Sequence, residues 1–242
     1  DTLIKLDCIA DAKAILDQAK SKGAKGDGFN QFEERLTGVA PATNVALNVQ
    51  NPPQNQLKTL VNLYTKRKYE EALKEASKLL MSFPNSVTLY NIIGATNKGL
   101  GKFEDSIRAY KNALLLKPDS AEAHYNMGNV LKEQGKLEEA VTSYLKALSL
   151  KPDYADVYNN MGNALKDQGK LDEAIGAYKK VVSIKPDYVE AYNNTGVTLQ
   201  DQGKLDEAIG AYKKVVCIKP DFAEAYYNMG IALKDQDKLE EA

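Results

Sequence analysis

The side chains that most often carry out chemistry are scarce in this sequence of 242 residues. His124 is the only histidine, so a Ser-His-Asp set has no second histidine to draw on. Cys8 and Cys217 are the only cysteines and lie far apart, so no Cys and His cluster has the spacing of a zinc site. The sequence predicts no catalytic residue, no metal site and no cofactor, and therefore no enzyme activity of its own.

Adjacent carboxylates recur along the chain, for example Glu138 with Glu139 and Asp172 with Glu173. Each pair stands at the predicted start of a helix, where negative charge interacts favourably with the helix dipole. We therefore interpret these pairs as helix starts rather than as general acids and bases. The glycines never form the GxxxxGK[ST] loop that cradles phosphates.

The charge balance excludes two classes of partner. Thirty-two basic and thirty-three acidic residues leave a formal charge of −1, without the basic excess that nucleic acids or anionic membranes attract. No run of eighteen apolar residues is present, and the first ten residues lack the pattern of a secretory signal. Two lone thiols favour a reducing compartment, so we expect a cytoplasmic protein.

An internal repeat dominates the organisation of the chain. The stretch DQGKLDEAIGAYKKVV at residues 167–182 recurs unchanged at 201–216, an offset of 34 residues. Repeats of this length indicate a solenoid. Stepping by the same offset divides the chain into 53–86, 87–120, 121–154, 155–188, 189–222 and a partial unit 223–242. Positions within a unit are called places here, counted from its first residue.

Each unit is predicted to contain two helices. Both halves carry apolar residues at helical spacing, and glycines such as Gly135 and Gly169 interrupt the pattern between them. Pro118 and its equivalents close successive units. An Asp follows each of the last four closing prolines, with an acid three residues later, as in Asp221 and Glu224. That spacing predicts a capping box at the start of the next helix.

Small and large residues alternate in a way that predicts close helix packing. A mid-helix glycine costs about 0.5–1 kcal/mol relative to alanine, so its recurrence at the eighth place indicates close backbone approach. The aromatic residues at the fourth and twenty-fourth places are the expected plugs between helices. The glycines are Gly94, Gly128, Gly162, Gly196 and Gly230, and the aromatic residues at the twenty-fourth place are Tyr110, Tyr144, Tyr178 and Tyr212.

These residues resemble the tetratricopeptide repeat: an aromatic near the start, Gly at the eighth place, Ala at the twentieth, an aromatic at the twenty-fourth and Pro at the thirty-second. The resemblance covers residues 53–242 and is weakest in unit 53–86, where Gln56, Leu60 and Ala76 replace the aromatic, the Gly and the second aromatic. It implies an all-α fold, a right-handed superhelical solenoid of antiparallel helix pairs. Its concave wall would be built from the first helix of each unit.

In this family the second, fifth, sixth, ninth, twelfth and thirteenth places face the groove. Here many of them carry asparagine, whose amide both donates and accepts hydrogen bonds and can hold a peptide backbone. The row resembles the asparagine ladder of O-linked N-acetylglucosamine transferases. An alternative is a solvated surface, and Tyr125 has the alternative of packing on its neighbours. The expected peptide-binding residues are Asn91, Asn126, Asn129, Asn159, Asn160, Asn163, Asn193, Asn194, Asn228, Tyr125, Tyr227, Lys132 and Lys166.

Charges along this wall bear on the ligand. The second place is acidic in four units, from Glu122 to Glu224, and no Arg occupies the sixth place. The clamp of Lys, Asn and Arg that some members of the family use to grip a terminal carboxylate is therefore absent. A neutral or partly basic segment is the expected ligand, unless these charges form only a solvated face.

Residues 1–52 do not follow the repeat. TLIKLDCIADAKAILDQAK has helical spacing, whereas GVAPATNVALNVQNPP reads as an extended linker because prolines and asparagines discourage helix. One interpretation is a leader whose helix caps the first unit. The other is a pseudo-ligand that occupies the groove of its own or a neighbouring chain.

Two functions are compatible with this reading. The first is a scaffold that presents an extended groove to a partner polypeptide. The second is the substrate-recruiting repeat domain of a larger, glycosyltransferase-like enzyme. The sequence stops at Ala242, early in the second helix of a unit. We therefore expect the natural chain to continue, and an exposed stacking face to favour end-to-end self-association.

Overall fold

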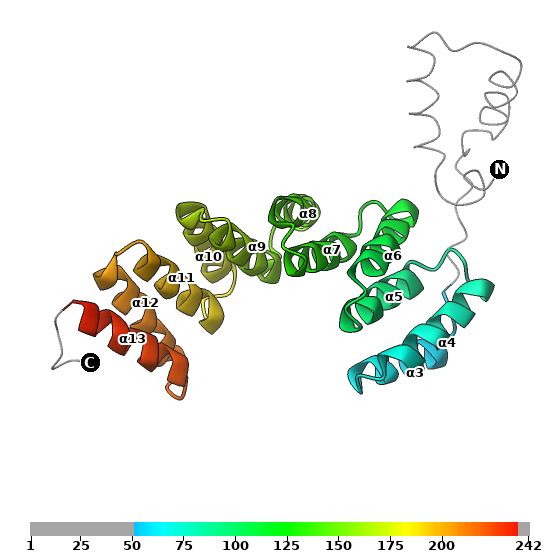
Figure 1. The fold of residues 1–242 in the computed structure, drawn as a ribbon, viewed down its shortest axis with the longest axis horizontal. Coiled ribbons are helices and arrows are strands. Elements are labelled where there is room, and N and C mark those ends of the chain that lie inside the picture. The colour runs from blue at the N-terminus through cyan, green and yellow to red at the C-terminus, as the bar shows by residue number, and fades with distance from the viewer. Residues whose placement is uncertain (1–50, 237–242) are drawn as a thin grey trace, which may run out of the picture. The chain divides into compact units, whose positions relative to one another are not determined.

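A computed structural model describes residues 51–236, and this part of the chain is helical throughout, without a strand. Figure 1 shows its helices following one another in chain order. Their bounds are α3 Gln54–Thr65, α4 Tyr69–Ser82, α5 Val87–Gly99, α6 Phe103–Leu116, α7 Ala121–Glu133, α8 Leu137–Leu150, α9 Ala155–Asp167, α10 Leu171–Ile184, α11 Val189–Asp201, α12 Leu205–Ile218 and α13 Ala223–Asp235.

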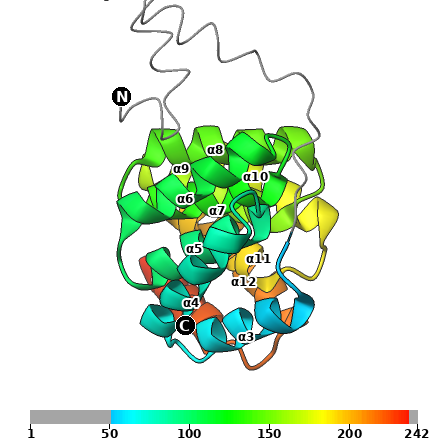
Figure 2. The same cartoon turned by 90° about the vertical axis from the view of Figure 1, so that its right-hand side faces the viewer.

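The helices form pairs that stack in sequence. Each odd-numbered helix from α3 to α11 packs against the helix that follows it, and the second helix of each pair packs against the first helix of the next pair. Figure 2 views the same stack from the α3–α4 end. This arrangement confirms the predicted all-α solenoid of antiparallel helix pairs. None of the helices in the described range is long and apolar enough to cross a membrane.

First helices also contact one another directly, α3 with α5, α5 with α7 and so on to α13. Second helices of successive pairs make no such contacts within residues 51–236. First helices are therefore closer neighbours than second helices, which places them on the inner side of the stack. We call the surface formed by α3, α5, α7, α9, α11 and α13 the inner face.

The helix ends differ from the expected capping boxes. The residue before each first helix from α5 to α13 is Ser86, Ser120, Tyr154, Tyr188 or Phe222, and in the last four of these the expected Asp lies one residue further upstream. Among these residues, the side chains of Ser86 and Ser120 accept the expected hydrogen bond from a backbone N–H, at 3.2 and 3.3 Å. The capping-box prediction was therefore wrong, because the turn after Pro places a different residue at the cap.

The turn within each pair is built on a left-handed residue. Gly135 has φ +74°, and the next residue, Lys136, donates its backbone N–H to the Leu131 carbonyl at 2.9 Å. This is the Schellman closure of a helix, which favours glycine because it has no Cβ. In the first pair Arg67 takes this position with φ +58°. The short closure sets the second helix antiparallel to the first.

A glycine and a tyrosine hold each of the four central pairs together. A Cβ at Gly162 would lie 2.5 Å from Cε1 of Tyr178, and at Gly94 it would lie 2.7 Å from Cε1 of Tyr110. All four tyrosines at the twenty-fourth place are fully buried. The eighth-place glycine does make a close contact, but its neighbour is the tyrosine ring of the second helix and not another backbone, as the prediction had it.

The first pair reverses this size pattern. Leu60 replaces the glycine on α3 and Ala76 replaces the tyrosine on α4, and both side chains are fully buried in one apolar cluster. The large residue therefore comes from the first helix and the small one from the second. In the next pair Ser106, which replaces alanine, donates from its hydroxyl to the Gly94 carbonyl at 2.6 Å. Departures from the repeat are thus compensated locally.

The predicted helix and linker of residues 1–52, and the predicted end-to-end contact of the last unit, fall outside the described residues, apart from Asn51 and Pro52. Asn51 accepts a hydrogen bond from the Ser86 hydroxyl at 2.7 Å, and Pro52 is buried.

Replacing Gly162 by alanine tests the packing of the central pairs. The added methyl group must displace the buried ring of Tyr178, so we expect a loss of about 1–3 kcal/mol in the free energy of unfolding. Gly176, on the outer surface of α10, is the matched control because a Cβ there meets no atom within 4 Å. Gly176→Ala should raise stability by about 0.5–1 kcal/mol. Thermal unfolding followed by circular dichroism measures both, and equal effects of the two changes would contradict this packing.

Candidate functional site

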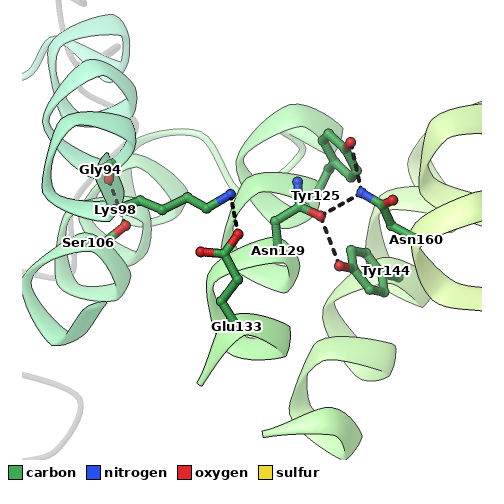
Figure 3. Close-up of polar contacts among 8 residues, drawn as sticks. All are labelled: Gly94, Lys98, Ser106, Tyr125, Asn129, Glu133, Tyr144 and Asn160. Carbon is green, nitrogen blue, oxygen red and sulfur yellow. Dashed lines mark hydrogen bonds and ion pairs between the residues drawn. The ribbon is translucent and has the colours of Figure 1, made fainter. Parts of the chain in front are cut away.

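Asparagine amides link neighbouring units along the inner face (Figure 3). Asn160 on α9 donates from its Nδ2 to the Asn129 Oδ1 at 2.9 Å and to the Tyr125 hydroxyl at 3.0 Å, both on α7. Asn129 Oδ1 also accepts a hydrogen bond from the Tyr144 hydroxyl at 2.8 Å. One amide carbonyl therefore joins both helices of its own pair to the first helix of the next.

The same arrangement recurs one unit later. Asn194 on α11 donates to the Oδ1 atoms of Asn163 and Asn159, each at 3.2 Å. Tyr178 donates from its hydroxyl to Asn163 Oδ1 at 2.7 Å. The sixth-place asparagines thus carry inter-unit hydrogen bonds, a role that the sequence interpretation did not include.

The ninth place decides whether this link forms. Asn126 and Asn228 also occupy the sixth place, but the ninth place of the preceding unit is Ala95 or Val197, which has no side-chain acceptor. Neither asparagine side chain has a hydrogen-bond partner within residues 51–236. The asparagine row therefore contains two hydrogen-bonded pairs, Asn129 with Asn160 and Asn163 with Asn194, which we call rungs. An asparagine without such a bond stands at each end of the row.

Tyr144, Tyr178 and Tyr212, at the twenty-fourth place, act as hydrogen-bond donors. Burial raises the pKa of the Tyr144 and Tyr178 phenols well above the ordinary value, and raises that of Tyr212 to about 12. All three therefore stay protonated at neutral pH. Tyr212 donates to Gln200 Oε1 at 3.1 Å because Val197 offers no amide at the ninth place.

In each rung, one amide N–H group and one amide carbonyl oxygen have no hydrogen-bond partner within the described residues. Asn160 uses its Nδ2 and keeps Oδ1 without a donor, whereas Asn129 uses its Oδ1 and keeps Nδ2 without an acceptor within the described part of the chain. Asn194 and Asn163 repeat this division. Because the bonds inside the network fix both amides, each rung presents a free N–H group and a free carbonyl in a set orientation.

The fifth-place asparagines are less accessible than expected. Asn159 and Asn193 are buried, with Asn159 bonded to Asn194 as above and Asn193 donating to Glu224 Oε1 at 3.0 Å. Asn91 is half-buried, and its Oδ1 is buried without a donor in the described range. Access to a ligand at these places is therefore greatest at Asn91.

The remaining predicted residues differ in their surroundings. The ring of Tyr125 packs on Tyr154 and Tyr144, with ring centroids 5.2 and 6.3 Å apart, as the alternative interpretation expected. The Tyr227 side chain is 70% exposed. Lys132 and Lys166 are half-buried near the ends of α7 and α9.

The acidic residues of the inner face have different partners. Asp156 accepts a hydrogen bond from the Tyr188 hydroxyl at 3.0 Å, and Glu224 is bonded to Asn193. Glu133 forms an ion pair with Lys98 at 2.8 Å, which links α7 to α5 (Figure 3). These three carboxylates therefore bind other groups of the protein. Glu122 is an exposed carboxylate that lies beside a cavity.

That cavity lies at the α3 end of the inner face and was not predicted. It has a volume of about 310 Å³. Its lining comes from three successive first helices and from the places already named as groove-facing. Val61 and Ala95 stand at the ninth place and Ile92 at the sixth, where the units of α7 and α9 carry asparagine. A search by place rather than by residue type would have found it. The lining residues are Val61, Tyr64, Thr88, Asn91, Ile92, Ala95, Glu122 and Asn126.

His124 is a packing residue, as expected from its place in the unit. Its Nε2 lies 3.3 Å from the Pro118 carbonyl oxygen, and burial lowers its pKa. Within residues 51–236 no three His, Cys, Asp or Glu side chains are grouped to hold a metal ion. Cys217 is an exposed free thiol.

Replacing Asn160 by alanine removes two half-buried hydrogen bonds between units. We expect a loss of about 1–2 kcal/mol in the free energy of unfolding, because each such bond contributes about 0.5–1.5 kcal/mol. Asn126→Ala is the matched control at the same place, and we expect its stability to stay within about 0.5 kcal/mol of the unchanged chain. Chemical denaturation measures both, and an equal loss in the two variants would show that the amide network does not stabilise the stack.

Comparison with known proteins agrees with this geometry. The TPR repeat family profile matches residues 98–135, 128–169, 162–203 and 198–237. A crystal structure of MamA is 31% identical with a TM-score of 0.62, covering 67% of this chain and 95% of MamA. None of the curated protein sequences compared with the chain matches it.

Two further structures share the fold. YrrB, described as a TPR protein with an unusual peptide-binding site, is 22% identical with a TM-score of 0.59, covering 71% of this chain and 89% of its own. PilW, a type IV pilus biogenesis factor, is 20% identical with a TM-score of 0.68, covering 78% and 89%. The family profile, the likeness to MamA and the stacked helix pairs together show that the chain belongs to the tetratricopeptide-repeat family.

Proposed function

We propose that the chain is a scaffold that binds an extended polypeptide along its inner face. The observation that carries this proposal is the pair of bonded rungs, Asn129 with Asn160 and Asn163 with Asn194. Each rung holds a free amide N–H group and a free amide carbonyl in fixed orientation. An extended peptide offers the complementary carbonyl and N–H groups along its backbone.

Fixed amides favour recognition of the backbone rather than of particular side chains. Their orientation is set before a ligand arrives, so binding orders fewer side chains and has a smaller entropic cost. The two rungs carry the same residues at the same places, one unit apart. A ligand that satisfies one rung is therefore well suited to satisfy the next, whatever its side chains.

The charges beside the rungs restrict the ligand further. Acidic residues occupy the second and thirteenth places of the central units, from Glu122 to Asp201, and Lys132 and Lys166 stand beside two of them. A strongly acidic segment would meet these carboxylates, so a neutral or partly basic segment fits better. The peptide-binding site named for YrrB, which shares the fold, is compatible with such a function in a TPR protein.

A second proposal, recruitment of substrate polypeptides to a glycosyltransferase-like domain, rests on the asparagine row. It requires the same sequence-tolerant binding, so the inner face would act in the same way. Peptides that bind irrespective of sequence would favour this second function, whereas a narrow set of bound sequences would favour a dedicated scaffold.

The double variant Asn129→Asp, Asn163→Asp tests the proposed contacts without removing the network. Each Asp keeps an oxygen that accepts from the tyrosine hydroxyl and from the next asparagine, but loses the free N–H group. We expect bound peptides to lose about 5- to 150-fold in affinity, because two hydrogen bonds of about 0.5–1.5 kcal/mol each are removed. An array of unrelated twelve-residue peptides, followed by titration of those that bind, measures this.

The matched control is Lys179→Gln with Lys213→Gln. This pair changes the net charge by the same two units but lies on the exposed surface of α10 and α12. It should leave affinity within about twofold, since screened charges on a distant surface contribute little. Undiminished binding by the Asp variant, or the absence of any bound peptide on the array, would overturn the proposal.

A further inference from the structure

The cavity at the α3 end has a different character from the asparagine rungs. Ile92 and Ala95 occupy the sixth and ninth places, where the central units carry the asparagines of the rungs. Val61 on α3 adds an apolar side chain that is 50% exposed. The inner face is therefore apolar beside α3 and α5, and rich in amides beside α7, α9 and α11.

Two amides at this cavity have no hydrogen-bond partner within residues 51–236. Asn91 Oδ1 is buried without a donor. Asn126 has no acceptor opposite it because Ala95 stands at the ninth place of the preceding unit. The buried Asn91 Oδ1 is out of a ligand's reach, so the Asn91 Nδ2 group and the Asn126 amide are the polar groups that a ligand backbone can contact.

An apolar floor with a few placed polar groups is the usual composition of a ligand pocket, and a volume of about 310 Å³ lies in the range of such pockets. Glu122 carries the only charge among its lining residues. Lys117 lines an adjoining cavity that also includes Asn91 and Glu122. The carboxylate disfavours an acidic ligand group and favours a neutral or basic one.

We propose that this cavity binds one large apolar side chain, of leucine or phenylalanine size, from the extended polypeptide that occupies the inner face. The residues flanking that side chain are neutral or basic, and the peptide backbone beside it hydrogen-bonds to the amide of Asn126. This inference rests on the proposed function. The cavity selects the sequence and fixes the register, while the asparagine rungs hold the backbone that follows.

The test starts from the full 242-residue chain and a library of random twelve-residue peptides displayed on phage. We expect the selected peptides to be enriched in one Leu, Ile or Phe with Lys or Arg nearby and to be poor in Asp and Glu. A chosen peptide is then synthesised with its apolar residue unchanged or replaced by serine. The replacement should weaken binding to the unchanged chain at least about tenfold, the scale expected for burying one such side chain.

The decisive variant is Ile92→Asn with Ala95→Asn. It gives the cavity the residues that the central units carry at the same places. The amide introduced by Ala95→Asn would supply the acceptor that Asn126 lacks and would offset part of the packing that Ile92→Asn removes from the cluster around Leu60. Circular dichroism of the variant establishes that the fold is retained. We expect the difference between the leucine and serine peptides to fall to about twofold. Leu145→Asn is the matched control, because it removes an exposed apolar side chain from α8, outside the cavity, and should keep the tenfold difference.

The outcomes separate this inference from the proposed function. Selected peptides without an apolar preference, or a difference that survives the double Asn variant, would overturn the cavity assignment while leaving the scaffold intact. Failure to select any peptide would overturn both. Analytical ultracentrifugation of the chain alone tests whether a second copy of the chain occupies the cavity instead. A dimer that the double Asn variant converts to a monomer would assign the cavity to a second copy and overturn the proposal.

Discussion

The contact between the eighth-place glycine and the twenty-fourth-place tyrosine sets the spacing of each central helix pair. Because the glycine has no side chain, the ring of Tyr144 lies directly on α7, and its hydroxyl reaches Asn129, the residue after Gly128. The oriented amide of Asn129 then accepts the hydrogen bond from Asn160 in the next unit. A packing contact of the fold thereby fixes the orientation of the amides on the inner face. A change in helix spacing would therefore disturb both the packing contact and the orientation of the amides.

Because of this coupling, the asparagine amides hold neighbouring units together and are oriented before any ligand binds. An amide that serves only a ligand loses rotational entropy when the ligand binds, whereas Asn160 and Asn194 are already held by two donated hydrogen bonds each. In the proposed function, folding and recognition use different atoms of the same amide. The inner face therefore has rigid hydrogen-bonding groups without a dedicated rigid element, because the stack itself supplies the support.

The sequence was sufficient to predict the helix pairs, the solenoid and the buried tyrosines between helices, since each follows from a period of 34 residues and from the size of the side chains. It was not sufficient to predict the caps, because the turn after Pro118 places Ser120 rather than Asp119 before α7. The hydrogen bonds of Asn160 were also missed, because they depend on which residue of the neighbouring unit lies opposite. The cavity beside Ile92 was missed for a further reason: the prediction rested on asparagines such as Asn91 and Asn126, and the apolar side chains that line the cavity with them were left out.

Departures from the repeat are therefore the most informative positions for recognition. A perfectly periodic inner face binds every register of an extended chain equally well, because a shift by one unit restores the same contacts. Selection of one register requires a place that differs from its equivalents. In this chain the ninth place provides that difference: asparagine in the units of α7 and α9 closes a rung, whereas Ala95 lines a cavity and leaves Asn126 without an acceptor. The same substitution that breaks the link between two units thus creates the feature that can distinguish one ligand sequence from another.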